Sequence, residues 1–407
     1  MIALNIVLVA LAVAFGLVPL LLTARLKRRL REIAQMPALP PFAPPASVVL
    51  PCKGLDPGFR ENIAALISQD YPDLELLFVV ATDDDPAYAV LTSLLAADAG
   101  RKAARARVLV AGLGIERAQK LTNQLAAVRQ ARPTSEVLVF VDSDCRPDPG
   151  FVRRLVQPLQ DKQIGATTGY RWYHPPAPTF GSVLRSTWNA GALPFLIDPK
   201  VVFAWGGAMA IRRQTFEQAG IARAWDRAVS DDMTLTVAVR DRGLDLQFVT
   251  SCIAVSYESS TLAETLEFTN RQSLISRIYF PPLWWGTAVG HSLANLLIFY
   301  GVACLALWLQ HGTTGWLIGS LCTLLVLVQA GNAAWMFGAA LELLPAPVRP
   351  QLRALRWHYI AMAPLASIMT LFNTVHAACT RRMVWRGICY ELRSPTETVV
   401  ISTDRAR

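Results

Sequence analysis

The sequence predicts an α/β domain with a mainly parallel sheet, joined to transmembrane helices at both ends of the chain. Hydrophobic residues make up 53% of the 407 residues and charged residues only 17%, with a mean hydropathy of +0.33. Soluble domains carry more charge than this, and the apolar excess lies at the two ends. Between the ends, short β-branched runs alternate with longer helical stretches, which indicates βαβ units and a parallel sheet.

The first apolar segment, Ile2–Thr23, contains no charged residue. About twenty such residues span a bilayer as a helix. A cleaved signal peptide is the alternative, but its positive charge would precede a shorter apolar core. The positive residues here follow the segment, at Arg25, Lys27, Arg28, Arg29 and Arg31. The positive-inside rule then places Met1 outside, and we expect an uncleaved anchor over residues 1–24.

The α/β domain is predicted over residues 46–280, after a proline-rich linker. Its predicted strands are Ser47–Pro51, Leu74–Ala81, Ala106–Val110, Glu136–Val141 and Ala166–Tyr170. Its predicted helices are Arg60–Gln69, Ala87–Ala97, Ala118–Ala131 and Pro149–Asp161. From about Val202 to Ser256 the pattern is mixed.

A second membrane region is predicted over residues 281–395, with a tail over 396–407. Gly286–Leu309 and Trp316–Ala340 are each long enough to span a bilayer. Tyr359–Cys379 is a third apolar stretch, and arginines at 381, 382 and 386 follow it. If it spanned, these arginines would lie outside, against the charge rule. We therefore expect an interfacial or re-entrant helix there.

The net charge of +9 indicates anionic partners. Much of this charge lies beside apolar segments, which favours the cytoplasmic side of a membrane over nucleic acid, and no nucleic-acid motif is present. The seven cysteines and five histidines are dispersed without metal-binding spacing, so a zinc site is not expected. We expect an integral membrane protein whose α/β domain is cytoplasmic, with a bacterial inner membrane as the setting.

The strongest functional signal is Asp142-Ser143-Asp144, at the end of an apolar predicted strand. In extended backbone, residues two apart project to the same side. Two converging carboxylates bind a hard cation, Mg²⁺ or Mn²⁺, which neutralises a diphosphate leaving group. A polar turn is the alternative, since Asp and Ser are common in loops. The position within a βαβ array favours the metal site.

Two further acidic clusters follow the same logic. In Thr82-Asp83-Asp84-Asp85, a carboxylate at the ligand-binding edge of the sheet could accept hydrogen bonds from a nucleotide. In Ser230-Asp231-Asp232, which precedes a helix ending near Gly243, a carboxylate could act as the general base for an attacking hydroxyl. Adjacent acids also raise one another's pKa. For both clusters the alternative is helix capping.

Three other residues are candidates for donor binding. Lys53 follows the first predicted strand, and Lys120 begins a predicted helix, where a lysine gains nothing from the helix dipole unless an anion binds. Both could instead be solvated surface charges. Gly206, in Trp205-Gly206-Gly207, would let a sugar ring approach bare backbone, although paired glycines also form plain turns.

Taken together, these residues resemble the ceramide glucosyltransferases and their bacterial relatives, within the family-2 inverting glycosyltransferases. The resemblance covers about Ser47 to Leu392. The segments that carry it are Pro51-Cys52-Lys53-Gly54-Leu55-Asp56-Pro57, Gln69-Asp70-Tyr71-Pro72, Asp84-Asp85-Pro86-Ala87, Asp142-Ser143-Asp144, Ser230-Asp231-Asp232, Asp241-Arg242-Gly243, Trp385-Arg386-Gly387 and Tyr390.

The resemblance implies a GT-A fold (Rossmann-like, with a mainly parallel sheet), a UDP-sugar donor, a divalent cation and inversion by direct displacement. By position, Asp142 matches the acid that binds metal and donor, Asp232 the catalytic base and Lys120 a donor-contacting lysine. Arg271 matches the first residue of an (Arg/Gln)-x-x-Arg-Trp motif. Trp385 and Arg386 complete the predicted donor-binding residues.

Two departures from the family pattern stand out. The early family aspartate falls on Thr82, so Asp83 or Asp84 would take its place. The Arg-Trp pair is replaced by Leu274-Ile275, and Arg277, further along a helix, would supply the missing arginine. Loss of the tryptophan removes an aromatic platform associated with the acceptor channel, which disfavours processive synthesis and favours a changed acceptor.

The expected function is that of an inverting, UDP-sugar-dependent hexosyltransferase acting on a lipid acceptor, with Asp232 as the base and Asp142 and Asp144 as the metal ligands. The alternatives are a transferase that uses UDP-N-acetylglucosamine and a hopanoid or polyprenyl lipid, and a catalytically silent membrane binding protein of the same fold.

Overall fold

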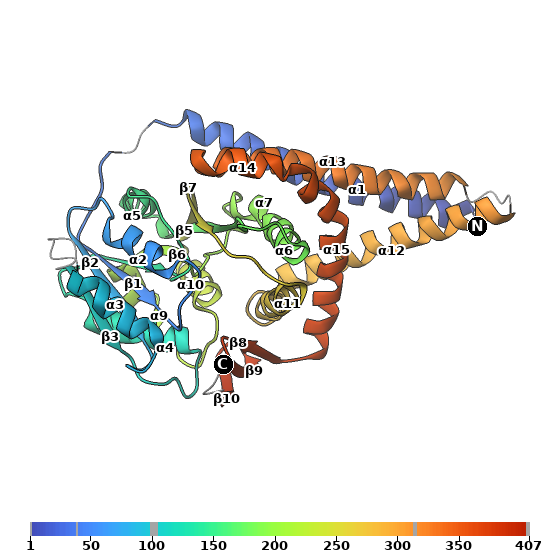
Figure 1. Cartoon of the computed structure of the whole chain (residues 1–407). Coiled ribbons are helices and arrows are strands. Elements are labelled where there is room, and N and C mark those ends of the chain that lie inside the picture. The colour runs from blue at the N-terminus through green and yellow to red at the C-terminus, as the bar shows by residue number, and fades with distance from the viewer. Residues whose placement is uncertain (1, 38–39, 98–104, 312–315, 404–407) are drawn as a thin grey trace. The chain divides into compact units, whose positions relative to one another are not determined.

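The computed structural model describes residues 2–37, 40–97, 105–311 and 316–403 (Figure 1). Contacts within the chain group it into two compact units. The helical unit comprises residues 1–36, 175–194 and 259–380. The sheet unit comprises residues 37–174, 195–258 and 381–407. The C-terminal segment therefore packs with the central α/β residues, which the sequence did not indicate.

The sheet unit is built on a seven-stranded sheet with the order β3-β2-β1-β4-β6-β5-β7. Its strands are β1 (Ala46–Pro51), β2 (Leu74–Val80), β3 (Ala106–Val110), β4 (Val137–Val141), β5 (Ile164–Tyr173), β6 (Ala208–Arg212) and β7 (Asp245–Ser256). Only β6 runs antiparallel to its neighbours, β4 and β5, so the sheet is mainly parallel as predicted.

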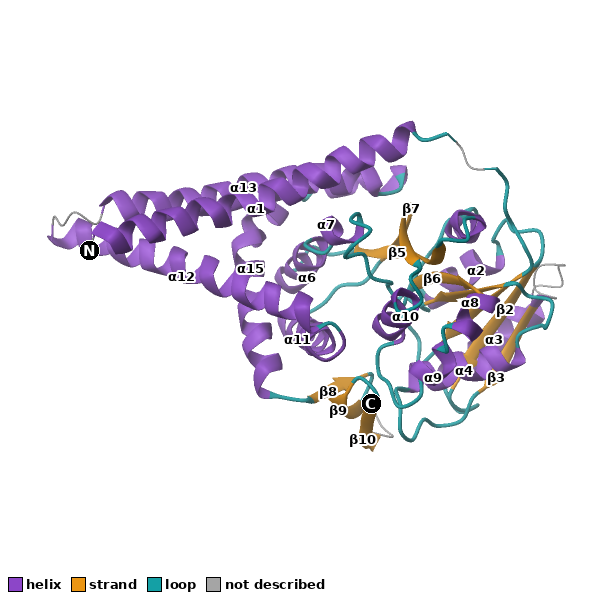
Figure 2. Cartoon of the chain, turned by 180° about the vertical axis from the view of Figure 1, so that it is seen from behind, coloured by secondary structure: helices purple, strands orange, loops and turns teal. Residues whose placement is uncertain are grey.

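Helices cover this sheet and begin near the ends of its strands (Figure 2). They are α2 (Phe59–Ile67), α3 (Pro86–Ala97), α4 (Gln119–Gln130), α5 (Phe151–Val156, continued by a 3-10 turn over Gln157–Gln160), α8 (Arg213–Gln218), α9 (Ile221–Ala224) and α10 (Asp231–Arg240). A separate three-stranded sheet is formed by β8 (Arg382–Trp385), β9 (Ile388–Ser394) and β10 (Glu397–Thr403). The last strand lies within the segment predicted as a tail.

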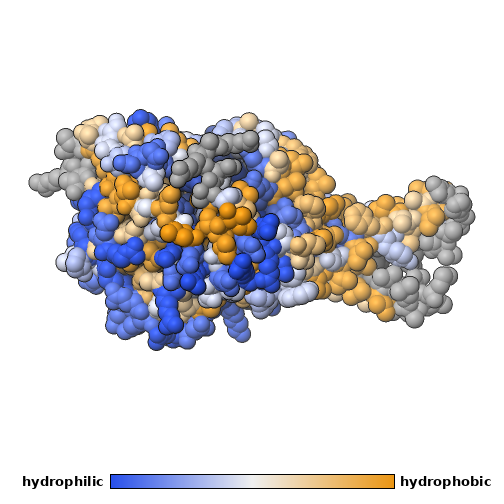
Figure 3. Space-filling model, turned by 90° about the horizontal axis from the view of Figure 1, so that it is seen from below, coloured by the Kyte–Doolittle hydropathy of each residue, from blue (hydrophilic) through white to orange (hydrophobic). Residues whose placement is uncertain are grey.

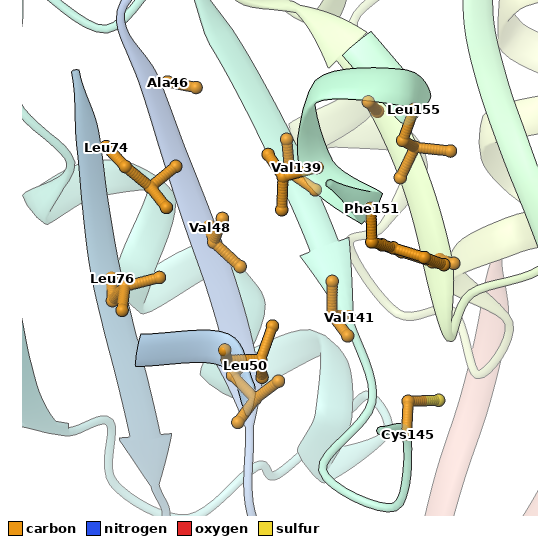
Figure 4. Close-up of a cluster of buried hydrophobic side chains, with 14 of the residues drawn as sticks. Ala46, Val48, Leu50, Leu74, Leu76, Val139, Val141, Cys145, Phe151 and Leu155 are labelled. Atoms are coloured by element: carbon orange, nitrogen blue, oxygen red, sulfur yellow. The ribbon is translucent and has the colours of Figure 1, made fainter. Parts of the chain in front are cut away.

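The core follows from the alternation of side chains along the strands. Val48 and Leu50 of β1 point to the same face as Leu76 of β2 and Val139 of β4, and Phe151 of α5 packs over them (Figure 4). All five side chains are almost fully buried. This packing fixes the ends of β1 and β4, from which the loops with Lys53 and Asp142 emerge.

The predicted strands and helices from Ser47 to Tyr170 are confirmed to within a few residues, apart from the early end of α5. The sequence missed β6, β7 and the three C-terminal strands. The mixed segment from Val202 to Ser256 contains the antiparallel strand β6, three helices and the long strand β7.

The helical unit contains the apolar ends of the chain and two inserted helices. Its elements are α1 (Ile2–Gln35), α6 (Phe180–Ala190), α11 (Leu262–Tyr279), α12 (Pro281–His311), α13 (Trp316–Leu343), a 3-10 turn (Ala346–Val348), α14 (Arg349–Ala354) and α15 (Arg356–Cys379). A four-residue helix, α7 (Leu193–Leu196), contains the point along the chain where the helical unit ends and the sheet unit resumes. The sequence predicted α1, α12 and α13, and the expected interfacial or re-entrant segment lies within α15.

Within the described residues, Pro281–Leu309, Thr323–Leu343 and Arg356–Cys379 are long and apolar enough to cross a membrane. Hydrophobic side chains dominate the surface of the long helices (Figure 3). Helix α1 lies along α13 in both cartoon views, and Thr23 Oγ1 donates to Asn332 Oδ1 across their contact at 2.8 Å (Figures 1 and 2). Similar polar contacts join α15 to its neighbours, from Thr269 on α11 to Asn373 and from Asn295 on α12 to Ser367.

Candidate active site

The candidate site lies at the edge of the seven-stranded sheet where β1 and β4 end and β6 begins. Val141, the last residue of β4, pairs with Ala208, the first of β6. Directly beyond this pair, the Asp142 amide donates to the Gly207 carbonyl at 3.2 Å. The carboxyl ends of parallel strands form the usual ligand-binding edge of such sheets. Helices α4 and α10 bring Lys120 and Asp231 to the same edge.

Lys120 joins two of the acidic clusters. Its Nζ lies 2.8 Å from Asp142 Oδ1 and 3.0 Å from Asp231 Oδ2, and it donates to the Gly206 carbonyl at 3.2 Å. Burial alone would lower the pKa of Lys120, but Asp142 and Asp231 outweigh it and the pKa is raised. Lys120 is therefore a structural ammonium of the site rather than a solvated surface charge.

The two acids that contact Lys120 have pKa values shifted in opposite directions. Burial raises the pKa of Asp231, the neighbouring Asp232 adds to this, and Lys120 opposes it only in part. Burial would also raise the pKa of Asp142, but Lys120 and Arg171 together hold it below its usual range. Asp142 is thus kept ionised, as a metal ligand requires.

Asp144 and Asp142 share a further cation, Arg171, which the sequence analysis did not identify. Arg171 Nη2 lies 2.9 Å from Asp142 Oδ2 and 2.7 Å from Asp144 Oδ1. Burial raises the pKa of Asp144 to about 6, against the lowering effect of Arg171. The only sequence signal was a charged residue inside an otherwise mostly apolar strand, β5.

Asp232 stands at the first turn of α10 and faces the backbone of residue 206. Its Oδ2 accepts from the Gly206 amide at 3.1 Å, and its Oδ1 accepts from the Met233 amide at 2.8 Å and from the Ser230 hydroxyl. Ser230 is the N-cap, with Oγ accepting from the Met233 amide. The Asp231 carboxylate contacts Lys120 and Gln124 instead, so it does not cap helix α10.

Gly206 is the residue against which these groups pack. A Cβ atom at this position would lie 2.6 Å from both carboxylate oxygens of Asp231 and 2.8 Å from Lys120 Nζ. These distances are well below van der Waals contact, so a side chain would displace the ion pair. The structure thus gives a steric reason for glycine here, apart from the predicted approach of a sugar ring.

Lys53 and Arg386 form a reciprocal contact at the end of β1. Lys53 Nζ donates to the Arg386 carbonyl, and Arg386 Nη1 donates to the Lys53 carbonyl, both at 2.5 Å. Arg386 Nη2 also lies 2.6 Å from Asp56 Oδ1. Asp56 Oδ2 in turn accepts from the hydroxyl of Ser143, at 2.5 Å. The hairpin of β8 and β9 is thereby tied to the loop that carries Asp142 and Asp144.

Arg386 lies in the tight turn between β8 and β9. Arg386 and Gly387 have φ angles of 48° and 75°, and Trp385 pairs with Ile388 around them. Two consecutive positive φ angles in a two-residue hairpin loop are typical of a type I′ turn, where Asn and Gly are preferred. Trp385 is the last residue of β8, beside this turn. Tyr390, also part of the resemblance, accepts from the Gln119 amide at 3.2 Å, next to Lys120.

Asp83 and Asp84 are exposed, and Thr82 donates to Asp84 within the loop. The third acid of this cluster is more closely integrated. Asp85 Oδ1 accepts from the amides of Gly54 and Ala87, both at 2.9 Å. Asp85 thus combines the expected capping of α3 with a contact to the loop of Lys53, whereas donor binding by Asp83 and Asp84 stays a prediction.

Arg271 and Arg277 lie on α11 and belong to the helical unit, whereas the residues described above belong to the sheet unit. Arg277 Nη1 donates to the carbonyls of Ala377 and Thr380 at the end of α15. Arg271 lies over the ring of Phe268, 5.4 Å from its centroid. Arg277 therefore supports the end of α15, and the donor contacts expected for both arginines stay predictions.

The carboxylate oxygens of Asp142 and Asp144 suit a hard divalent cation as ligands. Both carboxylates reach the same Arg171 nitrogen within 2.9 Å, so one positive centre can contact both. No group of three or more His, Cys, Asp or Glu side chains suited to a metal occurs in the described part of the chain. Two carboxylates with diphosphate and water oxygens form a usual ligand set for Mg²⁺ or Mn²⁺.

A mainly parallel sheet with paired acids at its ligand-binding edge defines the class as a GT-A glycosyltransferase fold. The sequence model of glycosyl transferase family 21 matches residues 4–398, and the chain belongs to that family. Membership confirms the resemblance stated from the sequence. The predicted fold class, a mainly parallel α/β domain with apolar helices at both ends, is likewise confirmed.

Individual relatives are more distant. A ceramide glucosyltransferase from Gibberella zeae is 28% identical over 140 residues, which cover 32% of this chain and 26% of the relative's length. A mannosyltransferase from Pyrobaculum calidifontis, solved with GDP-Man and Mn²⁺, has 18% identity and a TM-score of 0.47, covering 89% of this chain and 99% of its own. Glucosyl-3-phosphoglycerate synthase from Mycobacterium tuberculosis has 19% identity and a TM-score of 0.38, covering 57% and 80%.

Proposed function

We propose that the protein transfers a sugar from a UDP-sugar donor to a hydroxyl group of a lipid acceptor at the cytoplasmic face of a membrane, with inversion. The observation that carries this proposal is the contact of Lys120 with both Asp142 and Asp231. It brings together acids about ninety residues apart in the chain, and the predicted base, Asp232, is the next residue. Family membership supports sugar transfer as the reaction.

The residues have distinct roles in this proposal. Asp142 and Asp144 would hold a Mg²⁺ or Mn²⁺ ion, which when bound stabilises the negative charge of the departing diphosphate. Lys120 orders Asp142 and Asp231 around that position. Asp232 accepts the proton of the attacking hydroxyl, and its contacts with the Gly206 and Met233 amides fix its orientation.

The acceptor is proposed to be an amphiphile, for two reasons. Three described helices are long and apolar enough to cross a membrane. The Gibberella zeae relative is a ceramide glucosyltransferase, and ceramide is a lipid. We place the sheet unit on the cytoplasmic side because the basic residues follow the apolar part of α1.

Replacement of Asp232 by asparagine tests the catalytic assignment. Asp232→Asn keeps the size of the side chain and removes the base, so we expect UDP-sugar binding to stay within about threefold and transfer to fall at least about a thousandfold. Asp241→Asn, at the other end of α10, is the matched control. Transfer that persists in Asp232→Asn would show that another group is the base.

The substrates are found by mass spectrometry. Purified protein is incubated with a panel of UDP-sugars and membrane lipid extracts, and new glycolipids are identified by mass. A product with a ceramide, a hopanoid or a polyprenyl lipid would identify the acceptor. If no pair gives a product and no UDP-sugar is hydrolysed, the proposed activity is wrong.

A further inference from the structure

Arg171 lies at a position that is unusual for a strand residue of this sheet. It lies near the carboxyl end of β5, and its side chain is 11% exposed. Its Nη2 atom lies within 2.9 Å of one oxygen from each of Asp142 and Asp144. A single positive nitrogen therefore stands where the two carboxylates converge, which is where the predicted divalent cation would have to bind.

Aromatic side chains hold the guanidinium in this position. Its carbon lies 5.1 Å from the ring centroid of Trp205 and 5.5 Å from that of Tyr173. Arg171 Nη1 also donates to the Tyr173 hydroxyl at 3.2 Å. Arginine stacks well on such rings. These contacts are independent of the carboxylates, so the guanidinium stays in the site when one of its ion pairs is broken.

The other oxygen of Asp142 is also engaged, because Oδ1 contacts Lys120 at 2.8 Å. Lys120 touches Asp142 but not Asp144 in the contacts of the site, whereas Arg171 touches both. A divalent cation that coordinates both carboxylates through these oxygens therefore competes with Arg171 first. Positive charges at such short distances repel each other strongly in a partly buried site.

We propose that Arg171 is the resident counter-ion of the Asp142–Asp144 pair, which a divalent cation must displace from at least one carboxylate in order to bind. The inference rests on the metal site of the proposed function and deepens it. In the metal-free protein Arg171 holds two repelling acids together. With a metal bound, the Arg171 guanidinium could donate to the phosphate oxygens of the donor. Arg171 is thus a positioning residue that sets metal affinity.

The test measures Mn²⁺ binding to the detergent-solubilised full-length protein by the electron paramagnetic resonance signal of free Mn²⁺, with UDP present. Arg171→Met removes the competing charge and keeps an apolar side chain between the rings. We expect the Mn²⁺ dissociation constant to fall about tenfold. Arg171→Lys keeps the positive charge but loses the Nη1 contact with Tyr173 and the planar group that stacks on the rings, so it should give a smaller decrease.

Arg146→Met is the matched control. Arg146 follows Asp144 by two residues and pairs with Glu61 and Asn62, without contacting either metal carboxylate. Its removal changes the net charge by the same amount and should leave the Mn²⁺ dissociation constant within about twofold. A similar fall of the Mn²⁺ dissociation constant in Arg171→Met and in Arg146→Met would mean that general charge, and not the bridging contact, sets the affinity. That result would overturn the proposal.

A second readout uses thermal unfolding. Metal-free Arg171→Met should unfold at a lower temperature than the wild type, because Asp142 and Asp144 then repel each other without the shared cation. Added Mn²⁺ should raise its unfolding temperature by more than it raises that of the wild type. If Arg171→Met cannot be recovered folded, Arg171→Lys and the control decide the matter by the same two measurements.

The outcomes separate the inference from the proposed function. Wild-type protein that binds Mn²⁺ with the same dissociation constant as Arg171→Met, or more tightly, overturns the exchange and leaves the metal site intact. Wild-type protein that binds no Mn²⁺ in the presence of UDP overturns the metal site and, with it, this inference. Tighter binding confined to the Arg171 variants supports both.

Discussion

Two residues of the site, Lys120 and Gly206, both determine where the Asp231 carboxylate lies. Lys120 attracts Asp231 with its ammonium at 3.0 Å, and Gly206 leaves the space that the carboxylate occupies. Neither residue contributes apolar burial that would explain its presence. Their effects on ion pairing and on steric space can therefore be measured separately.

At Lys120, we expect a loss of stability as well as of donor binding. Lys120→Met leaves Asp142 and Asp231 without their shared cation, which should cost about 2 kcal/mol, or roughly 4–8 °C in the unfolding midpoint. This is less than for a fully buried pair because Asp142 is 23% exposed. Differential scanning fluorimetry measures the change. Lys162→Met, at an exposed position, is the control, and equal midpoints for the two variants would contradict the structural role.

At Gly206, we expect a large effect on transfer and a small one on folding. The methyl group of Gly206→Ala would meet Asp231 and Lys120 at 2.6–2.8 Å, so these side chains must shift. A displacement of about 1 Å in such a site costs about a hundredfold in kcat/KM. The measurement is a transfer assay beside a thermal melt. Gly290→Ala, where an added Cβ meets no atom within 4 Å, is the control, and unchanged kcat/KM in Gly206→Ala would refute the steric argument.

At the scale of elements, the hairpin of β8 and β9 has a role that its place in the chain does not suggest. Its turn brings Arg386 to the carbonyl of Lys53 and the carboxylate of Asp56, and Asp56 accepts from Ser143. The backbone of Arg386 adopts a positive φ of 48°, which is uncommon for a residue with a long side chain. Asn or Gly would suit this turn position better, and what arginine adds there is its side-chain contacts with Lys53 and Asp56.

We expect Arg386→Asn to weaken donor binding and leave the hairpin folded. Asparagine tolerates a positive φ, so the turn is kept, but the guanidinium contacts to Lys53 and Asp56 are lost. A hydrogen bond to a charged group is worth about 1.5–3 kcal/mol, so the KM for the UDP-sugar should rise about tenfold or more. Steady-state kinetics with varied donor measures this.

Arg393→Asn, on β9 of the same hairpin, provides the comparison, since Arg393 pairs with Glu391 and Glu397 and not with the loops of the site. Its KM should match that of the wild type. A fall in kcat with unchanged KM in Arg386→Asn would show that the hairpin acts on the reaction step and not on the donor.

The same elements show what the sequence could predict. Strands β1 to β4 and helices α2 to α4 follow local patterns, with apolar β-branched runs and helical periodicity, and they were identified. β6 was missed because its five residues lie between a glycine pair and helices, and its antiparallel pairing with β4 and β5 is a long-range choice. The acids and Lys120 carried a recognisable spacing, whereas Arg171 and Asp56 act through contacts that only the fold creates.

At the scale of the whole molecule, we propose a membrane topology from contacts within each of the two units. β8 to β10 belong to the sheet unit, bound to Asp56 and Gln119, so the chain after α15 returns to the side of the sheet. In this proposal, two full crossings by α12 and α13 satisfy this requirement. A third crossing by α15 would leave the C-terminal strands on the wrong side.

Contacts within the helical unit agree with two crossings, by α12 and α13. Lys27, on the basic side of α1, lies 3.2 Å from Glu342 at the end of α13, so α13 ends on that side. Arg277, just before α12 begins, donates to the carbonyls at the end of α15. Figures 1 and 2 show α15 running across the direction of α12 and α13. We therefore propose that both ends of α15 lie on one side of the membrane, as expected of an interfacial or re-entrant helix.

Labelling with a membrane-impermeant maleimide tests this topology in variants that each keep one cysteine. Arg353→Cys precedes α15, Cys379 ends it, and both positions are exposed. If α15 does not cross, both should react in inverted vesicles and neither in intact cells, because both would then lie on the cytoplasmic side proposed for the sheet unit. Leu309→Cys, exposed near the far end of α12, should show the reverse pattern. Labelling of Arg353→Cys and Cys379 from opposite sides would make α15 a third crossing, and the C-terminal strands could then not bind Asp56 and Gln119 on the cytosolic side.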